Sequence, residues 1–150
     1  EETLELIADD YGVEIEKDAM SEIAKRSRKT PRTANYLLKR SRDVAQLDRA
    51  PLSRAVAEKA LAMIGIDEAG LTPSDRKILE ALITKFAGGP VGLKTLAAAA
   101  SEEEETIEEV YEPYLMQEGF LDRTQRGRVA TDRAWKHLKI TRDERQKKLL

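Results

Sequence analysis

The chain has 150 residues, of which 41% are apolar and 36% charged, and its formal net charge is −2. This length fits one ordinary domain or two small ones. The lack of cysteine excludes a disulfide scaffold, a thiolate nucleophile and a cysteine-ligated zinc, and the single histidine, His137, argues against a His-rich metal site or a Ser-His-Asp triad. No apolar run is long enough to cross a membrane. We expect a soluble protein of a reducing compartment, with no metal site.

Basic side chains are concentrated in two stretches. Residues 25–42 hold eight basic and no acidic side chains, and residues 120–148 hold ten basic and four acidic ones. The remainder of the chain is acidic. Two cationic stretches on an acidic body indicate surfaces that face anions such as phosphate, although Lys- and Arg-rich helix surfaces also serve solubility alone.

The first half of the chain has apolar side chains at helical spacing. Helices are predicted over residues 3–11, over residues 16–28, from Pro31 onward, and from the cap Ser53 through Ile64. Thr30 is expected to cap the third of these helices, with Pro31 in its first turn. Its inner face is predicted to consist of Ala34, Leu37, Leu38, Ser41 and Ala45. We place a boundary in the glycine-flanked connector that follows, and residues 1–68 are predicted to form a small helical bundle.

Residues 71–150 are predicted to form a second domain. Four helices are expected, from Pro73 to Phe86, from Lys94 to Ala100, over 102–118 and over 132–139. Ser101 and Glu104 have the spacing of a capping box for the third of them. Its core face is predicted to be Ile107, Val110, Tyr111 and Leu115, and Pro113 predicts a kink or an early end.

Two short alternating segments, 120–124 and 128–131, predict strands joined by a turn at 125–127. Three helices, a two-stranded hairpin and a further helix are typical of a winged helix. The fold class is therefore mainly α, a helical bundle followed by a winged-helix domain with a β-hairpin wing.

The wing carries Arg123, Arg126 and Arg128, and Gly127 is expected at its tip. In alternating strands Arg123 and Arg128 can project to one side, while Arg126 lies at the turn. Three arginines on a slender hairpin suit contact with DNA phosphates or the minor groove without sequence preference. The alternative is a solvated hairpin edge whose charges prevent aggregation.

The helix before the wing is strongly acidic. In many helix-turn-helix proteins the corresponding helix enters the major groove. Here it carries seven carboxylates, those of Glu102, Glu103, Glu104, Glu105, Glu108, Glu109 and Glu112. A groove lined with phosphates would repel them. Sequence-specific recognition through this helix is therefore not expected.

Arg32 stands in the first turn of the helix that Pro31 opens. A cation there opposes the helix dipole by roughly 0.3–1 kcal/mol. A nearby phosphate would reverse this penalty, because helix N-termini and guanidinium groups both favour it. Position alone leaves two alternatives, a phosphate ligand or a surface arginine paired with a carboxylate. The other basic residues of the stretch, among them Arg26, Arg28, Lys39 and Arg40, are expected to face solvent or a neighbouring subunit, and we favour solvent.

The second half resembles the C-terminal region of the RuvB family of bacterial Holliday-junction branch-migration motors. The matching stretches are Asp75-Arg76-Lys77, Gly88-Gly89-Pro90-Val91-Gly92-Leu93, Thr95-Leu96-Ala97, Val110-Tyr111-Glu112-Pro113-Tyr114-Leu115, Gly119-Phe120-Leu121 and Arg126-Gly127-Arg128-Val129-Ala130-Thr131. The first half resembles the AAA+ lid (small ATPase) domain of the same family through Ala24-Lys25-Arg26-Ser27-Arg28, Thr30-Pro31-Arg32, Leu37-Leu38-Lys39-Arg40 and Arg42-Asp43. Two residues depart from the family pattern, since Lys29 replaces a usual glycine and Gln125 a usual proline.

The resemblance implies a role for each cationic stretch. It makes Arg32, with Pro31 beside it, the lid's sensor of the γ-phosphate of ATP, and it makes Arg123, Arg128 and, less directly, Arg126 contacts to duplex DNA. It also implies a cytoplasmic, hexameric parent that uses ATP and Mg²⁺ to move Holliday-junction arms with RuvA, which would contact a domain outside this chain.

No Gly-x-x-x-x-Gly-Lys-Ser/Thr motif occurs in the sequence, so the chain alone is not expected to hydrolyse ATP, and it holds no catalytic residue. Its start without Met, within a helical pattern, predicts a fragment of a longer protein. Two other functions stay open at this point. One is a winged-helix transcription regulator with a helical partner domain, and the other is an adaptor whose basic patches dock acidic proteins.

Overall fold

The computed structural model of the chain describes residues 14–142, and the chain divides into two compact units, Glu1–Pro73 and Ser74–Leu150. The helix predicted over residues 3–11 lies outside the described residues. Within residues 14–142, no helix combines the length and the apolar character needed to span a membrane.

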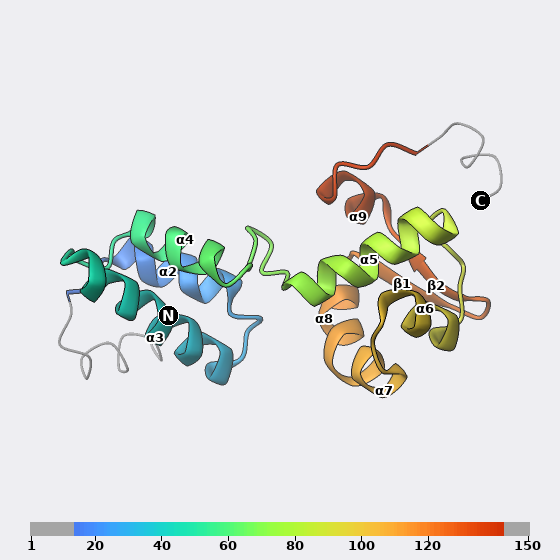
Figure 1. Cartoon of the computed structure of the whole chain (residues 1–150), viewed down its shortest axis with the longest axis horizontal. Helices are drawn as coiled ribbons and strands as arrows, with labels where there is room; N and C mark the ends of the chain where they lie inside the picture. Colours follow the sequence, from blue (N-terminus) through green and yellow to red (C-terminus); the bar gives the residue numbers. More distant parts are fainter. Residues whose placement is uncertain (1–13, 143–150) are drawn as a thin grey trace. The chain divides into compact units, whose positions relative to one another are not determined.

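The first unit is a bundle of three described helices, α2 (Lys17–Arg26), α3 (Pro31–Asp48) and α4 (Arg54–Met63), which pack side by side (Figure 1). The predicted caps are confirmed. The Thr33 N–H donates to Thr30 Oγ1 at 3.3 Å, and the Val56 N–H donates to Ser53 Oγ at 3.3 Å. These bonds satisfy amide groups that have no partner inside the first turn of a helix.

An aliphatic core holds the three helices together. Its largest members come from all of them and from the segment before α4, and each is fully buried: Ile23, Leu37, Leu38, Leu52 and Leu61. The five residues predicted to form the inner face of α3 are all buried, so the helical spacing alone identified that face correctly. Burial of each large side chain contributes about 1.5–3 kcal/mol to this core.

Not all of the basic stretch 25–42 faces solvent. Arg26 is buried, because its Nη2 forms an ion pair of 2.7 Å with Glu22 Oε1 one turn earlier on α2. Arg54 of α4 reaches the same carboxylate at 3.5 Å and bonds Glu58 at 2.9 Å, and these contacts raise the pKa of Arg54, with the hydrogen bond to Glu58 as the largest cause. The prediction that Arg26 faces solvent is therefore wrong, since a buried guanidinium persists when a carboxylate pairs with it. The exposed basic residues of the stretch are Lys25, Lys29, Arg32, Lys39 and Arg40.

The turn between α2 and α3 contains two residues with left-handed backbone. Arg28 and Lys29 have φ values of 58° and 56°, in the left-handed region. A residue with a Cβ atom adopts this region at a cost of roughly 1–2 kcal/mol, which glycine avoids. Lys29 therefore occupies a backbone position that favours glycine.

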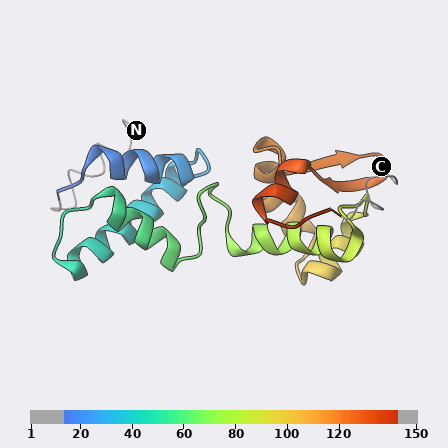
Figure 2. The same ribbon diagram turned by 90° about the horizontal axis from the view of Figure 1, so that it is seen from above.

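The second unit is a winged helix. Its elements are α5 (Pro73–Phe86), α6 (Leu93–Ala100), a third helix in the three segments α7 (Glu104–Thr106), η2 (Ile107–Tyr111) and α8 (Glu112–Gln117), the strands β1 (Leu121–Thr124) and β2 (Gly127–Ala130), and α9 (Asp132–His137). Figure 2 shows the two strands as neighbouring arrows. The expected class, mainly helical with a two-stranded antiparallel hairpin, is confirmed.

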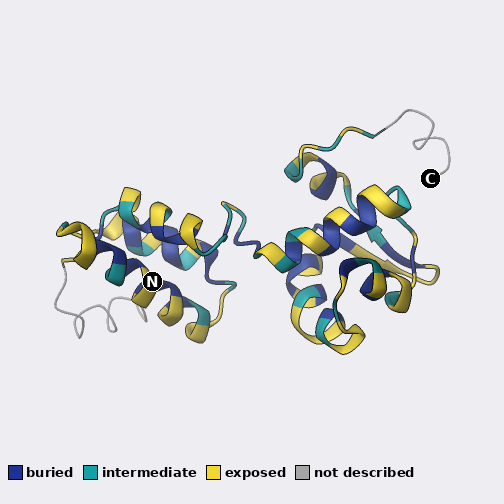
Figure 3. Cartoon of the chain, in the orientation of Figure 1, coloured by how far each residue is buried: buried dark blue, intermediate teal, exposed yellow. Residues whose placement is uncertain are grey.

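The core of this unit lies between α5, the third helix and the hairpin. Figure 3 shows α5 alternating between buried and exposed segments, as expected for an amphipathic helix. The buried apolar residues of this unit include Ile78, Leu79, Leu82, Leu96, Ile107, Leu115 and Phe120, each fully buried.

The predicted capping box at Ser101 is wrong. Ser101 has a φ of 54° and ends α6, with its N–H bonded to the carbonyl of Ala98 at 3.3 Å. An N-cap residue needs extended backbone, so a left-handed Ser101 cannot begin the next helix. Glu103 takes the N-cap position instead, and its side chain makes no capping bond.

The helix passes through Pro113 by widening rather than by ending. Proline lacks an N–H, and its ring excludes the carbonyl four residues earlier. The preceding segment, η2, is accordingly a π-helix, and the Glu112 N–H donates to the carbonyl of Ile107, five residues back. The wider turn changes which side chains of the helix point into the core. Val110, predicted in the core, is 55% exposed, whereas Glu112 is buried.

Candidate nucleic-acid interface

The wing is a short hairpin in which Arg123 pairs with Arg128 and Thr124 pairs with Gly127. Gln125 and Arg126 form the turn, and both are exposed. Thr124 Oγ1 donates to the Gly127 carbonyl at 2.8 Å and accepts from the Arg126 N–H at 3.3 Å. These bonds close the turn and leave the Arg126 guanidinium at the tip.

The sequence predicts Gly127 at the tip of the wing, and that prediction is wrong. Gly127 is the first residue of β2. Its φ is 131°, and a Cβ atom placed there would lie 2.3 Å from the Val91 carbonyl oxygen. Val91 and Arg128 form an antiparallel bridge, with the Arg128 N–H donating to Val91 O at 2.7 Å and the Val91 N–H donating to Arg128 O at 3.1 Å. The glycine permits this close approach, which fastens β2 to the segment before α6.

The residues just before Val91 pack against the same strand. A Cβ atom on Gly89 would lie 2.3 Å from the Arg128 carbonyl oxygen, and one on Gly88 would lie 3.0 Å from the Trp135 ring. The Gly88 carbonyl accepts from the Ala130 N–H at 2.9 Å. The motif Gly88-Gly89-Pro90-Val91 lies in the α5–α6 connection. Through these contacts it holds the base of the wing and also lies close to Trp135 of α9.

Arg128 does not point into solvent. Its side chain is 10% exposed, its Nε donates to Glu112 Oε1, and its Nη2 donates to Glu112 Oε2 at 3.3 Å. This two-point contact uses the guanidinium face that would bind a phosphate. The expectation that the Arg128 side chain projects from the hairpin into solvent is therefore wrong, whereas its contact with DNA stays a prediction.

Arg123 is the exposed member of the cross-strand pair. Its Nη2 lies 2.9 Å from Glu108 Oε1, and the two side chains are 48% and 45% exposed. The wing arginines thus face the acidic helix on one side of the hairpin, Arg123 opposite Glu108 and Arg128 opposite Glu112. The shared face of Arg123 and Arg128 is as the alternation predicts, but the carboxylates across from it are a feature that our sequence interpretation missed. Glu108 and Glu112 are four residues apart, which places them on one helix face, and this spacing is the signal that was available.

The remaining carboxylates of the third helix stay in solvent. Glu103, Glu104, Glu105 and Glu109 are exposed, and Glu102 is partly exposed. Among residues 14–142, no group of three or more acidic or histidine side chains is placed to hold a metal ion. This helix surface is therefore anionic where a groove-binding helix needs cations or neutral polar groups.

In the first unit, Arg32 and Pro31 are both exposed in the first turn of α3. Within the described part of the chain, the Arg32 side chain has no ion pair or hydrogen bond. The alternative of a surface arginine paired with a carboxylate therefore finds no support among these residues. Arg32 and the wing arginines belong to different units.

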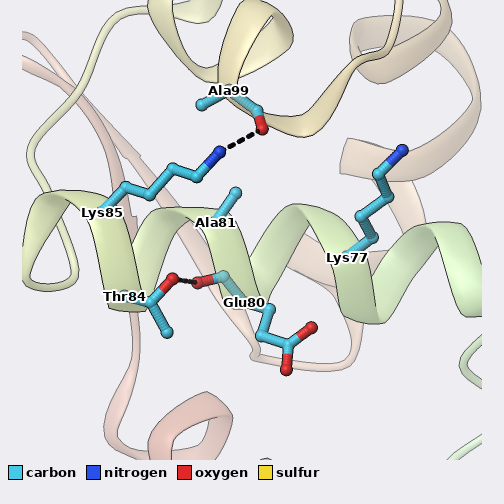
Figure 4. A pocket seen from close by; sticks show the side chains of 6 residues that line it. All are labelled: Lys77, Glu80, Ala81, Thr84, Lys85 and Ala99. Atoms are coloured by element: carbon cyan, nitrogen blue, oxygen red, sulfur yellow. Dashed lines mark hydrogen bonds between the residues drawn. The ribbon is translucent and has the colours of Figure 1, made fainter.

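A surface hollow of about 290 Å³ lies between α5 and α6, lined by Lys77, Glu80, Ala81, Thr84, Lys85 and Ala99 (Figure 4). Lys85 Nζ donates to the Ala99 carbonyl at 2.9 Å, and Thr84 Oγ1 donates to the Glu80 carbonyl at 2.7 Å. Lys85 thereby satisfies a carbonyl in the last turn of α6. The Lys85–Ala99 hydrogen bond thus joins the two helices beside the hollow.

Two family models match the chain. The model described as the RuvB AAA lid domain matches residues 2–67, and the model described as the RuvB C-terminal winged helix domain matches residues 68–139. Curated relatives are similar over most of the chain. The Holliday junction branch migration complex subunit RuvB of Chlorobium luteolum is 58% identical over 124 residues, which are 82% of this chain and 36% of the relative. The same subunit of Oleidesulfovibrio alaskensis is 55% identical over 130 residues, 86% of this chain and 40% of the relative.

Solved structures give the same result. The RuvB Holliday junction branch migration motor of Thermotoga maritima has a TM-score of 0.85 and 47% identity, covering 93% of this chain and 46% of that one. A point mutant of the Thermotoga maritima RuvB has a TM-score of 0.88 and 48% identity, covering 91% and 46%. The chain thus spans less than half the length of these proteins.

Proposed function

The chain belongs to the RuvB family, and from this premise we propose that it is the lid and DNA-binding part of an ATP-driven motor that moves Holliday junctions during recombination and repair. The parent would be a cytoplasmic, hexameric ring that works with RuvA and uses ATP and Mg²⁺. The triphosphate would be held by a domain outside this chain, because the sequence lacks the phosphate-binding Gly-x-x-x-x-Gly-Lys-Ser/Thr motif. The family resemblance implies that RuvA would contact that same domain.

Within this chain, the wing binds the backbone of duplex DNA without sequence preference. The observation that carries this proposal is the exposed Arg126 at the tip of a hairpin whose base is fixed by the Val91 bridge and the Glu112–Arg128 pair. A guanidinium on a fixed support loses less freedom when it binds a phosphate. Arg123 is a second contact, and Arg128 contributes by holding the strand on which the contacts depend.

In the lid, Arg32 is the proposed nucleotide sensor. Its exposure in the first turn of α3 leaves the guanidinium accessible to a γ-phosphate bound elsewhere in the parent, and Pro31 fixes the backbone just before it. Phosphate binding would relieve the unfavourable placement of a cation at a helix N-terminus. Loss of the γ-phosphate would remove that contact and release the lid.

The wing proposal is tested by fluorescence anisotropy with labelled duplexes of several unrelated sequences over a range of salt concentrations. Arg126→Gln is expected to weaken binding about equally for every duplex, and to reduce the slope of log K against log salt by about 0.9 if the residue neutralises one phosphate. Lys136→Gln is the matched control, since it removes one positive charge from α9, outside the wing, and should change the slope less.

A loss that depends on base sequence would favour the other winged-helix function, a transcription regulator. The acidic surface of the third helix argues against that function, because it would have to enter a groove lined with phosphates. An unchanged slope in Arg126→Gln would show that the wing tip does not contact the backbone.

A further inference from the structure

The third helix and the wing are joined by two neighbouring ion pairs. Glu108 and Glu112 lie one helical turn apart, and Arg123 and Arg128 face each other across the hairpin. Each glutamate takes one arginine, Glu108 with Arg123 and Glu112 with Arg128. Two carboxylates one helical turn apart therefore lie opposite two guanidinium groups of a cross-strand pair.

The two pairs differ in their access to solvent. The Glu112–Arg128 side chains are 2% and 10% exposed, whereas those of Glu108 and Arg123 are 45% and 48% exposed. A buried pair with two hydrogen bonds is costly to open. An exposed pair with one contact is weak and exchanges readily with other ions. Only the outer pair can therefore open when a competing anion arrives.

A DNA phosphate is such an anion. Guanidinium N–H groups bind carboxylate and phosphate oxygens with the same donors and at similar distances. The Nη2 of Arg123 already has a carboxylate oxygen at 2.9 Å. A phosphate that binds Arg123 through Nη2 competes with the Glu108 carboxylate for that group. A phosphate that binds the other N–H groups of the guanidinium still lies close to the carboxylate, which repels it.

We propose that Glu108 is an internal competitor for the phosphate that Arg123 binds, and so sets the affinity of the wing for DNA. This inference rests on the proposed function of the wing. Because Glu112 is held by Arg128, the helix is fixed in the orientation that keeps Glu108 opposite Arg123. The pair lowers the affinity of a single wing, which suits a protein that must release DNA repeatedly.

The test is the affinity of the 150-residue chain for a random-sequence duplex, measured by anisotropy for Glu108→Gln and Glu109→Gln. Both changes remove one negative charge from the same helix. Glu109 is exposed and, within residues 14–142, forms no ion pair with the wing, so it controls for the general effect of charge. Glu108→Gln is expected to bind roughly two- to fivefold more tightly than Glu109→Gln, as the loss of an exposed competing pair implies.

The same comparison in an Arg123→Gln background separates the mechanism from other causes. There the two glutamine variants should bind equally, because Arg123 is the group for which Glu108 competes. Equal binding in the original background, with DNA binding still weakened in Arg126→Gln, would overturn the role of Glu108 and leave the proposed function standing. An original chain that binds no duplex at all would overturn both.

Discussion

Arg128 and Glu112 show how a charged residue acquires a structural role through its partner. Each side chain is nearly inaccessible, and the pair links β2 to α8. Removal of one partner from a buried ion pair leaves an uncompensated charge, whereas replacement of both by apolar groups is often tolerated. The contribution of Arg128 to DNA binding is therefore expected to act through the stability of the wing.

Arg128→Met is predicted to destabilise the winged-helix unit by about 3–5 kcal/mol, because it leaves the buried Glu112 carboxylate without a partner. The double variant Glu112→Met/Arg128→Met should recover most of that loss. Urea unfolding followed by the fluorescence of Trp135, the single tryptophan of the chain and a buried residue of this unit, measures both values. A single variant that costs less than about 1 kcal/mol would contradict the structural role of the pair.

The wing as an element depends on glycines where backbone segments approach closely. Gly127 has both a positive φ and a carbonyl oxygen 2.3 Å from the position of a Cβ atom. Either feature alone disfavours other residues, and together they leave no conformation in which a side chain fits without movement of Val91. The hairpin is therefore fixed in place by its contacts with the α5–α6 connection as well as by its own hydrogen bonds.

Gly127→Ala is predicted to destabilise the unit by at least about 2 kcal/mol, through backbone strain and overlap with Val91. Gly92→Ser is the matched control. A Cβ atom on Gly92 meets nothing within 4 Å, and serine suits the N-cap position that Gly92 holds on α6. The stability of the Gly92→Ser variant should change little in the same unfolding experiment, which is followed by tryptophan fluorescence. Equal stabilities of the two variants would show that the wing tolerates displacement from Val91.

The third helix shows where periodicity misleads at this scale. A regular helix places Val110 in the core, but the π-helical segment before Pro113 exposes it and buries Glu112 instead. The sequence signal for a disturbance at Pro113 was correct, and the form of the disturbance was not predictable from it. A kink, an end and a π-helical turn all relieve the clash of the proline ring.

The whole molecule consists of two units with separate cores, and the proposed roles divide between them. The wing, its anchors at Val91 and Glu112, and the competitor Glu108 all lie in the second unit, while Arg32 lies in the first. DNA binding is therefore expected to be a property of the winged-helix unit alone.

Residues 74–150 expressed alone are predicted to bind random duplex within about threefold of the affinity of the full chain at about 0.15 M salt, where a screening length of about 8 Å limits the influence of distant charges. Anisotropy with the same labelled duplex measures the ratio. A loss of tenfold or more would show that the first unit takes part in DNA binding.

The sequence by itself determined the approximate positions of the described helices of both units, the caps at Thr30 and Ser53, the hairpin and the family resemblance, because these depend on local spacing and on residue types with strong backbone preferences. Only the tertiary structure decided which arginines are available to an anion. Arg26, Arg123 and Arg128 look alike in the sequence, yet each meets a different carboxylate at a different depth. The strength of an ion pair depends on burial and geometry, and both are set by packing between elements.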